Sequence, residues 1–202
     1  MHRFLDGFAL EPRVVEDTIE KVRAVAIWNR NTWAKRTVTI VTTNREDAEL
    51  DAHQLSSLRR RDKDYGVCWI RGLQAHIWLA PERNSEECMD TLIHEVAHAF
   101  CGAGTSHDGP WRRLNTIAQV LVRDLNDNEG SILAHAVVEG STRPRDAGWY
   151  QAPGPIKDGY YAEEYYPAES HSDWMKRVEK EATRAIAGFQ KARSDKVLKD
   201  FV

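Results

Sequence analysis

Apolar residues recur at helical spacing in three separate stretches of the chain. The first covers residues 14–29, the second follows Asn84, and the third begins near Ser172. Apolar side chains three and four positions apart lie on one face of a helix, so each stretch predicts an amphipathic helix. The second is the most clearly bounded, because Asn84 is a favourable N-cap, Glu87 follows three residues later and Gly102 supplies a stop.

Alternating β-branched and apolar residues predict strands before this second helix. Residues 36–43 read RTVTIVTT, which predicts one strand. Residues 66–80 contain two apolar runs on either side of Arg71-Gly72, which predicts a hairpin. Residues 44–64 are polar and charged, and they fit a loop or an exposed helix equally well.

A further helix is expected over residues 109–126, where a proline in the first turn precedes a second apolar stripe. Residues 131–139 fit a short helix or a strand. From residue 140 the chain becomes rich in Pro, Gly and Tyr without any periodic pattern, which indicates a long irregular connection.

These elements predict an α+β fold. We expect a small sheet packed against helices 86–101 and 109–126, with an added C-terminal helix. The corresponding organisation is a core at residues 1–139, a Tyr/Pro/Gly-rich linker at 140–170 and an amphipathic helix at 171–202.

Composition narrows the class of protein. The chain has 202 residues, of which 29% are charged and 42% hydrophobic, as in globular proteins. Its net charge of −3 argues against a protein that binds nucleic acid over its whole surface. Three cysteines, Cys68, Cys88 and Cys101, fit a reducing compartment and are too few for a four-cysteine zinc site. No apolar run reaches the roughly 18 residues that span a bilayer, and the N-terminal segment lacks a signal-peptide core. We therefore expect a cytoplasmic protein with no membrane partner.

The sequence His94-Glu95-Val96-Ala97-His98 falls within the second predicted helix. Positions four apart lie on one helix face, so both imidazoles can reach a single ion. Zinc accepts neutral imidazole nitrogens, and three protein ligands with one water make a catalytic site. Glu95 lies beside this face, where its carboxylate can take a proton from the zinc-bound water and pass it to the leaving amine. The alternative interpretation is an exposed helix face that carries two histidines and a glutamate.

A third protein ligand is expected shortly after this helix. His107 follows His98 by nine residues, after a glycine-containing turn, and precedes the next predicted helix. We predict His107 as the third ligand, and the alternative for this residue is a capping or surface histidine. Three carboxylates are the other candidates: Asp108 beside it, and Asp127 and Glu129 near the end of the following helix.

The chain resembles the catalytic core of the SprT-like zinc metalloproteases. The similarity covers about residues 15–126 and rests on a Gly-x-Cys hairpin, a strand, a T-L-x-H-E-x-x-H-A helix, and a later histidine followed by glycine and an aromatic residue. In this chain these features are Gly66 and Cys68, residues 75–80, residues 91–99, and His107 with Gly109 and Trp111. The resemblance implies a zincin-like fold in which His94, His98 and His107 hold zinc and Glu95 is the general base.

The chain departs from the pattern of this family in two ways. Asp108 is inserted between the histidine and the glycine, and no cysteine follows Cys101, so the C-terminal zinc ribbon of many members is missing. The position six residues after the second histidine, where many zincins carry their third ligand, is Gly104. In zincin-like folds the strand before the metal helix, here residues 75–80, forms the sheet edge along which an extended peptide lies.

The resemblance implies a zinc metalloprotease of HExxH type that hydrolyses peptide bonds in protein or peptide substrates, with Glu95 activating a zinc-bound water. One alternative is a zinc hydrolase that is not a protease, such as an amidase. Another is a nucleic-acid-associated or assembly protein on a zincin scaffold, with structural zinc. Association with DNA stays open as an expectation from the family, and the net charge argues against it.

Overall fold

The computed structural model describes residues 2–42, 65–81, 83–102, 107, 109–142 and 170–201. The chain divides into two compact units, residues 1–103 with 197–202, and residues 104–196. Segment 44–64 and almost all of the expected linker lie outside the described residues. Among the described helices, none combines the length and the apolar character that crossing a bilayer requires.

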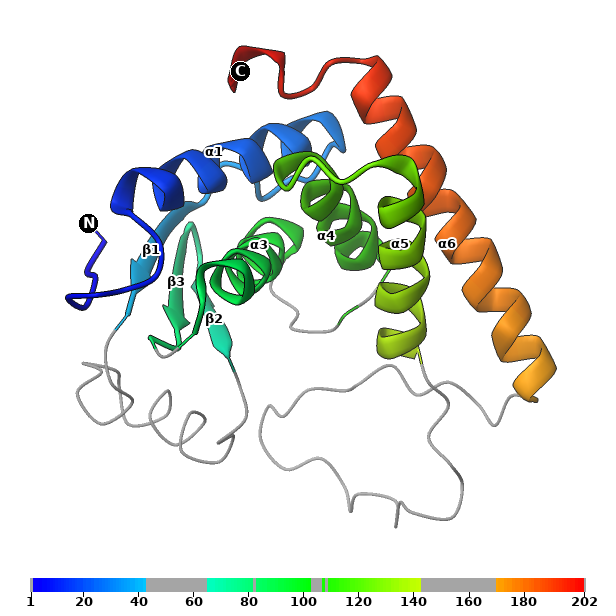
Figure 1. The fold of residues 1–202 in the computed structure, drawn as a ribbon, viewed down its shortest axis with the longest axis horizontal. Helices are drawn as coiled ribbons and strands as arrows, with labels where there is room; N and C mark the ends of the chain where they lie inside the picture. The colour runs from blue at the N-terminus through cyan, green and yellow to red at the C-terminus, as the bar shows by residue number, and fades with distance from the viewer. Residues whose placement is uncertain are drawn as a thin grey trace, which may run out of the picture. The chain divides into compact units, whose positions relative to one another are not determined.

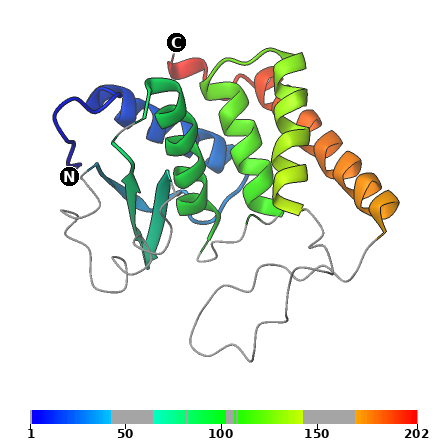
Figure 2. The same cartoon turned by 60° about the horizontal axis from the view of Figure 1, so that its bottom comes forward.

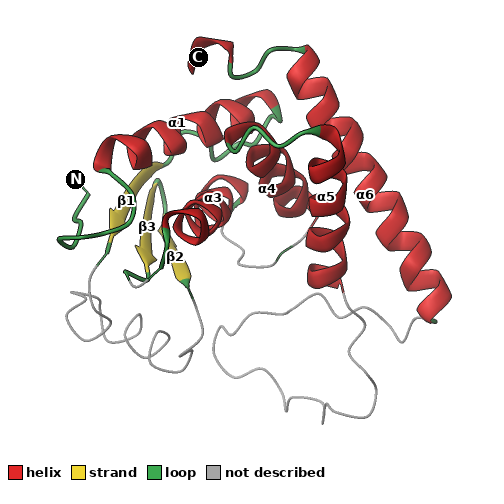
Figure 3. Cartoon of the chain, viewed as in Figure 1, coloured by secondary structure: helices red, strands yellow, loops and turns green. Residues whose placement is uncertain are grey.

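The first unit contains a three-stranded mixed sheet, drawn in yellow in Figure 3. Its strands are β1 (Thr37–Val41), β2 (Gly66–Arg71) and β3 (Gln74–Leu79). Their order is β1-β3-β2, with β1 parallel and β2 antiparallel to β3. The predicted hairpin is confirmed, and Gly72 turns it with a φ of 58°, a conformation that glycine adopts without strain.

The expectation that residues 75–80 form a sheet edge is wrong. Strand β3 is central, because β1 pairs with one side of it and β2 with the other. Its central position explains why Ile77, Trp78 and Leu79 are all buried, since such a strand is covered on both faces.

Two helices of the first unit, α1 (Pro12–Trp28) and α3 (Ser85–Cys101), pack against each other, and α3 also packs against β2 and β3. Figure 2 shows α3 running beside these two strands. The start of α3 is the predicted one, since the Asn84 side chain accepts a hydrogen bond from the Glu87 N–H at 2.9 Å. The helix that carries the HExxH motif is therefore fixed to the sheet.

A buried arginine holds the other end of α3. Nη1 of Arg36 donates to the carbonyl oxygens of Ala99 and Gly102, each at 2.8 Å, and Nε donates to the Gly72 carbonyl at 3.0 Å. The guanidinium lies 4.1 Å from the centre of the Trp33 ring, and burial lowers the pKa of Arg36. The last carbonyls of a helix lack partners within it, so Arg36 joins the end of α3 to the β2–β3 turn.

The second unit consists of α4 (Gly109–Val122), α5 (Asp127–Thr142) and α6 (His171–Ser194), each packed against the other two. Trp174, Val178, Ala182 and Ala185 of α6 share a buried cluster with residues of α5. These three helices can be followed from green to red in Figure 1.

The helix boundaries after residue 108 differ from the expected ones in three places. The helix predicted over 109–126 ends at Val122, and Asn126 and Glu129 form a reciprocal capping box at the start of α5. Residues 131–139, for which a short helix or a strand was expected, belong to α5 and are helical. The C-terminal helix ends at Ser194, and a short 3₁₀ helix, η1 (Lys199–Phe201), follows it. The predicted α+β class is confirmed.

Candidate metal centre

Helix α3 presents two imidazoles at metal-binding separation. The Nε2 atoms of His94 and His98 lie 3.3 Å apart, and their ring centroids lie 5.0 Å apart with 64° between the planes. With Zn–N bonds of about 2.0–2.1 Å, two ligands of a tetrahedral zinc ion are about 3.3–3.4 Å apart. The histidine pair therefore matches the spacing that a tetrahedral ion requires, and residues of one rigid helix provide it.

The polar side chains of this motif are largely buried. Glu95 is 7% exposed and His98 5%, while the His94 side chain is 33% exposed. Carboxylates are rarely buried to this extent without a specific partner. The alternative of an exposed helix face is therefore wrong. The Glu95 Oε1 atom lies 3.9 Å from His94 Nε2, so the carboxylate borders the ligand nitrogens.

Strand β2 approaches Glu95 closely because its first residue is glycine. A Cβ atom at Gly66 would lie 2.6 Å from Thr91 Cγ2 and 2.9 Å from Glu95 Cγ. Real Cβ atoms essentially never make contacts this short. In the sequence, Gly66 stands out only as part of the family resemblance. Its physical role, seen in the structure, is to leave room for the Glu95 side chain against the sheet.

Cys68 follows Gly66 by two residues on β2, and its thiol interacts electrostatically with the Glu95 carboxylate. Burial raises the pKa of Cys68, the negative charge of Glu95 raises it further, and the Arg36 guanidinium opposes the shift. The group therefore remains a thiol at neutral pH, whereas metal binding and nucleophilic attack need the thiolate. This supports the interpretation of Cys68 as a structural side chain.

The third predicted ligand, His107, lies just before α4. Its ring meets the Trp111 ring edge-on, with 4.3 Å between centroids, and its carbonyl oxygen accepts a hydrogen bond from Arg112. Ligand atoms of His94, His98 and His107 all lie within 4.8 Å of one another, so the group could hold a metal ion.

The alternative oxygen ligands have other partners or lie outside the described part of the chain. Asp127 forms an ion pair with Arg193, and the Glu129 carboxylate accepts the Asn126 N–H at 2.8 Å. Asp108 is outside the described residues. Asp127 and Glu129 therefore stabilise α5 and its contact with α6.

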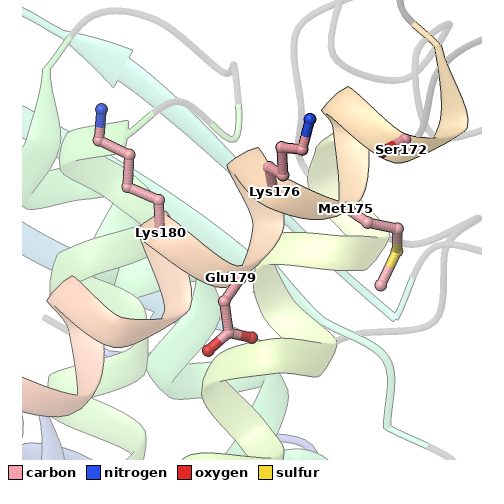
Figure 4. Close-up of a pocket in the computed structure, with 5 residues that line it drawn as sticks. All are labelled: Ser172, Met175, Lys176, Glu179 and Lys180. Atoms are coloured by element: carbon pink, nitrogen blue, oxygen red, sulfur yellow. The ribbon is translucent and has the colours of Figure 1, made fainter.

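A pocket lies along α6, and Figure 4 shows the side chains that line it. They are Ser172, Met175, Lys176, Glu179 and Lys180, all from this one helix. Two ammonium groups and a single carboxylate are a poor donor set for a metal ion. The pocket along α6 is therefore not a candidate metal site.

Comparison with known proteins found no matching family model, curated protein or solved structure. The residues and geometry of the candidate centre are therefore the basis for a functional hypothesis.

Proposed function

We propose that the protein is a zinc-dependent metallopeptidase, with His94, His98 and His107 as zinc ligands and Glu95 as general base. The observation that carries this proposal is the geometry of α3. Two imidazole nitrogens lie 3.3 Å apart, and a buried carboxylate lies 3.9 Å from one of them. A structural zinc site with four protein ligands has no need for such a carboxylate.

The donor set suits zinc, because neutral imidazoles are among its preferred ligands and no thiolate is at hand. When bound, the ion supplies Lewis acidity to the scissile carbonyl and lowers the pKa of water towards 7. Glu95 takes a proton from the attacking water on its carboxylate and delivers it to the nitrogen of the leaving amine. Packing of Gly66 against the Glu95 side chain holds this carboxylate beside the ligands.

The sheet supports a peptide as substrate. Among the described strands, β2 pairs with β3 alone, and it packs against α3. An extended peptide can add to such an edge through main-chain hydrogen bonds. Because Gly66 of β2 faces Glu95, this edge is the one next to the catalytic carboxylate. The proposal therefore assigns peptide binding to β2 in place of residues 75–80.

The decisive variant is Glu95→Gln. It keeps the shape of the side chain and removes the base, so we expect zinc content near one ion per chain and a loss of cleavage of about 10²–10⁴-fold. Zinc is measured by elemental analysis, and cleavage with an unfolded protein as substrate. Glu87→Gln is the matched control, because Glu87 is an exposed glutamate on the same helix, and it should cleave like the wild type.

Cleavage that is unchanged in Glu95→Gln would contradict the mechanism. Zinc binding with hydrolysis of small amides but not of proteins would favour the amidase alternative. Zinc binding without any hydrolysis would favour the structural one. Parallel reactions with and without DNA test whether DNA affects cleavage.

A further inference from the structure

We propose that Arg112 and Glu181 form a positioning pair that sets the orientation of His107 from the C-terminal helix α6. The proposal rests on the proposed function, since it requires His107 to be a metal ligand. It assigns a role in the metal site to α6, a helix whose role the sequence did not explain.

The three residues are linked by direct hydrogen bonds within the second unit. Nε and Nη2 of Arg112 lie 2.9 and 2.8 Å from Oε2 of Glu181, and Nη1 donates to the carbonyl oxygen of His107. Arg112 and Glu181 are 69 residues apart in the sequence. A single guanidinium thus joins α6 to the residue that precedes α4.

The charges of Arg112 and Glu181 suit a role in positioning His107. The Arg112 side chain is 5% exposed, and a buried cation requires a partner, which Glu181 provides. The planar guanidinium offers N–H groups in fixed directions, so holding Glu181 also fixes the direction in which Nη1 points. A lysine has one ammonium group on a flexible stem and would not hold both acceptors in this geometry.

Packing of α6 fixes the position of the Glu181 carboxylate. The neighbouring residues Val178 and Ala182 are buried in the cluster shared with α5. The Glu181 side chain is 23% exposed and lies at the margin of this cluster. The position of Glu181 is therefore fixed by packing that does not involve the metal ligands.

Fixing the His107 carbonyl acts on the imidazole through the backbone. The carbonyl and the Cβ of a residue share the same Cα, so holding the peptide plane restricts where the ring can lie. Trp111, in the first turn of α4, contacts that ring edge-on. Groups that orient metal ligands in this indirect way typically change metal affinity by about 10–100-fold when they are mutated.

The test is the zinc affinity of Glu181→Gln in the full chain, measured by competition with a chromophoric chelator. We expect binding about 10–100-fold weaker than in the wild type. Asp127→Asn is the matched control, because it removes the carboxylate of another arginine pair, in which Asp127 of α5 holds Arg193 of α6. Its zinc affinity should equal that of the wild type.

A double-mutant cycle separates positioning from general loosening of the unit. In a His107→Ala background, Glu181→Gln should cause no further loss of affinity, because the residue it positions is gone. An equal loss in both backgrounds would overturn the proposal. Arg112→Lys should behave like Glu181→Gln, and it provides the same cycle if Glu181→Gln does not fold.

Failure of this inference is distinguishable from failure of the proposed function. A wild-type chain that binds no zinc contradicts both. A wild-type chain that binds zinc, together with a Glu181→Gln variant of equal affinity, contradicts only the positioning role.

Discussion

Replacing Gly66 by alanine tests whether the close approach of β2 to α3 sets the position of Glu95, the proposed general base. The new Cβ would lie 2.6 Å from Thr91 Cγ2 and 2.9 Å from Glu95 Cγ. Carbon atoms in contact are normally about 3.5–4.0 Å apart, so the two surfaces must separate by about 1 Å. Overpacking of this kind costs about 1–3 kcal/mol of folding free energy.

The larger effect should be on catalysis. A displacement of about 1 Å at a reacting group can lower the rate about 100-fold. Zinc binding should change little, because the atoms nearest to a Cβ at Gly66 belong to Thr91 and Glu95 and not to the proposed histidine ligands. We therefore expect kcat for a peptide substrate to fall about 100-fold, with zinc content near that of the wild type.

Two further variants make this prediction specific. Gly140→Ala is the control, because nothing lies within 4 Å of a Cβ at that position, and kcat should be unchanged. Adding Thr91→Ser to Gly66→Ala removes the methyl group at 2.6 Å and keeps the hydroxyl that bonds the Glu87 carbonyl, so part of kcat should return. A Gly66→Ala variant with wild-type kcat would refute the idea that this contact positions Glu95.

Three other predictions concern stability. Arg36→Met removes the donors to the Gly72, Ala99 and Gly102 carbonyls and should lower the free energy of unfolding by about 3 kcal/mol or more, measured by urea denaturation. The His2 Nδ1 atom accepts the Ile40 N–H at 3.0 Å, and burial lowers the pKa of His2 below 6.5. The folded state therefore favours neutral His2. The contribution of His2 to the free energy of unfolding should be full above pH 6.5 and should decline as the pH falls. Comparing the stability of wild type and His2→Phe across this pH range would reveal the decline. Zinc at about 1,000 times its Kd should add about 4 kcal/mol to the stability of the metal-free protein, and an unchanged Tm would contradict specific binding.

Local chemistry accounts for what the sequence could predict. The Asn84 cap, the glycine stop and the apolar spacing define α3, and these signals act between residues a few positions apart. The capping box at Asn126 and Glu129 is of the same kind, so the ambiguity over residues 131–139 could have been resolved from the sequence.

The order of the strands and the supports of the site depend on residues far apart in the chain. Strand β3 is central because β1 pairs with it across more than thirty positions, and no local pattern encodes that pairing. The contact of Arg36 with the Ala99 carbonyl spans 63 positions, and that of Arg112 with Glu181 spans 69. Arginines with distant partners look like ordinary charged residues in a sequence.

The all-nitrogen donor set of the proposed centre has a consequence for which metal would bind there. Three imidazoles offer no soft thiolate, and Cys68 nearby stays protonated. Affinities at such a site follow the Irving–Williams order, in which copper(II) binds more tightly than zinc. Occupancy of the proposed centre would then be decided by metal supply during folding and purification. Cobalt(II), which also accepts imidazole ligands, would serve as a coloured reporter of the coordination geometry, and activity measurements should begin from stripped and reloaded protein.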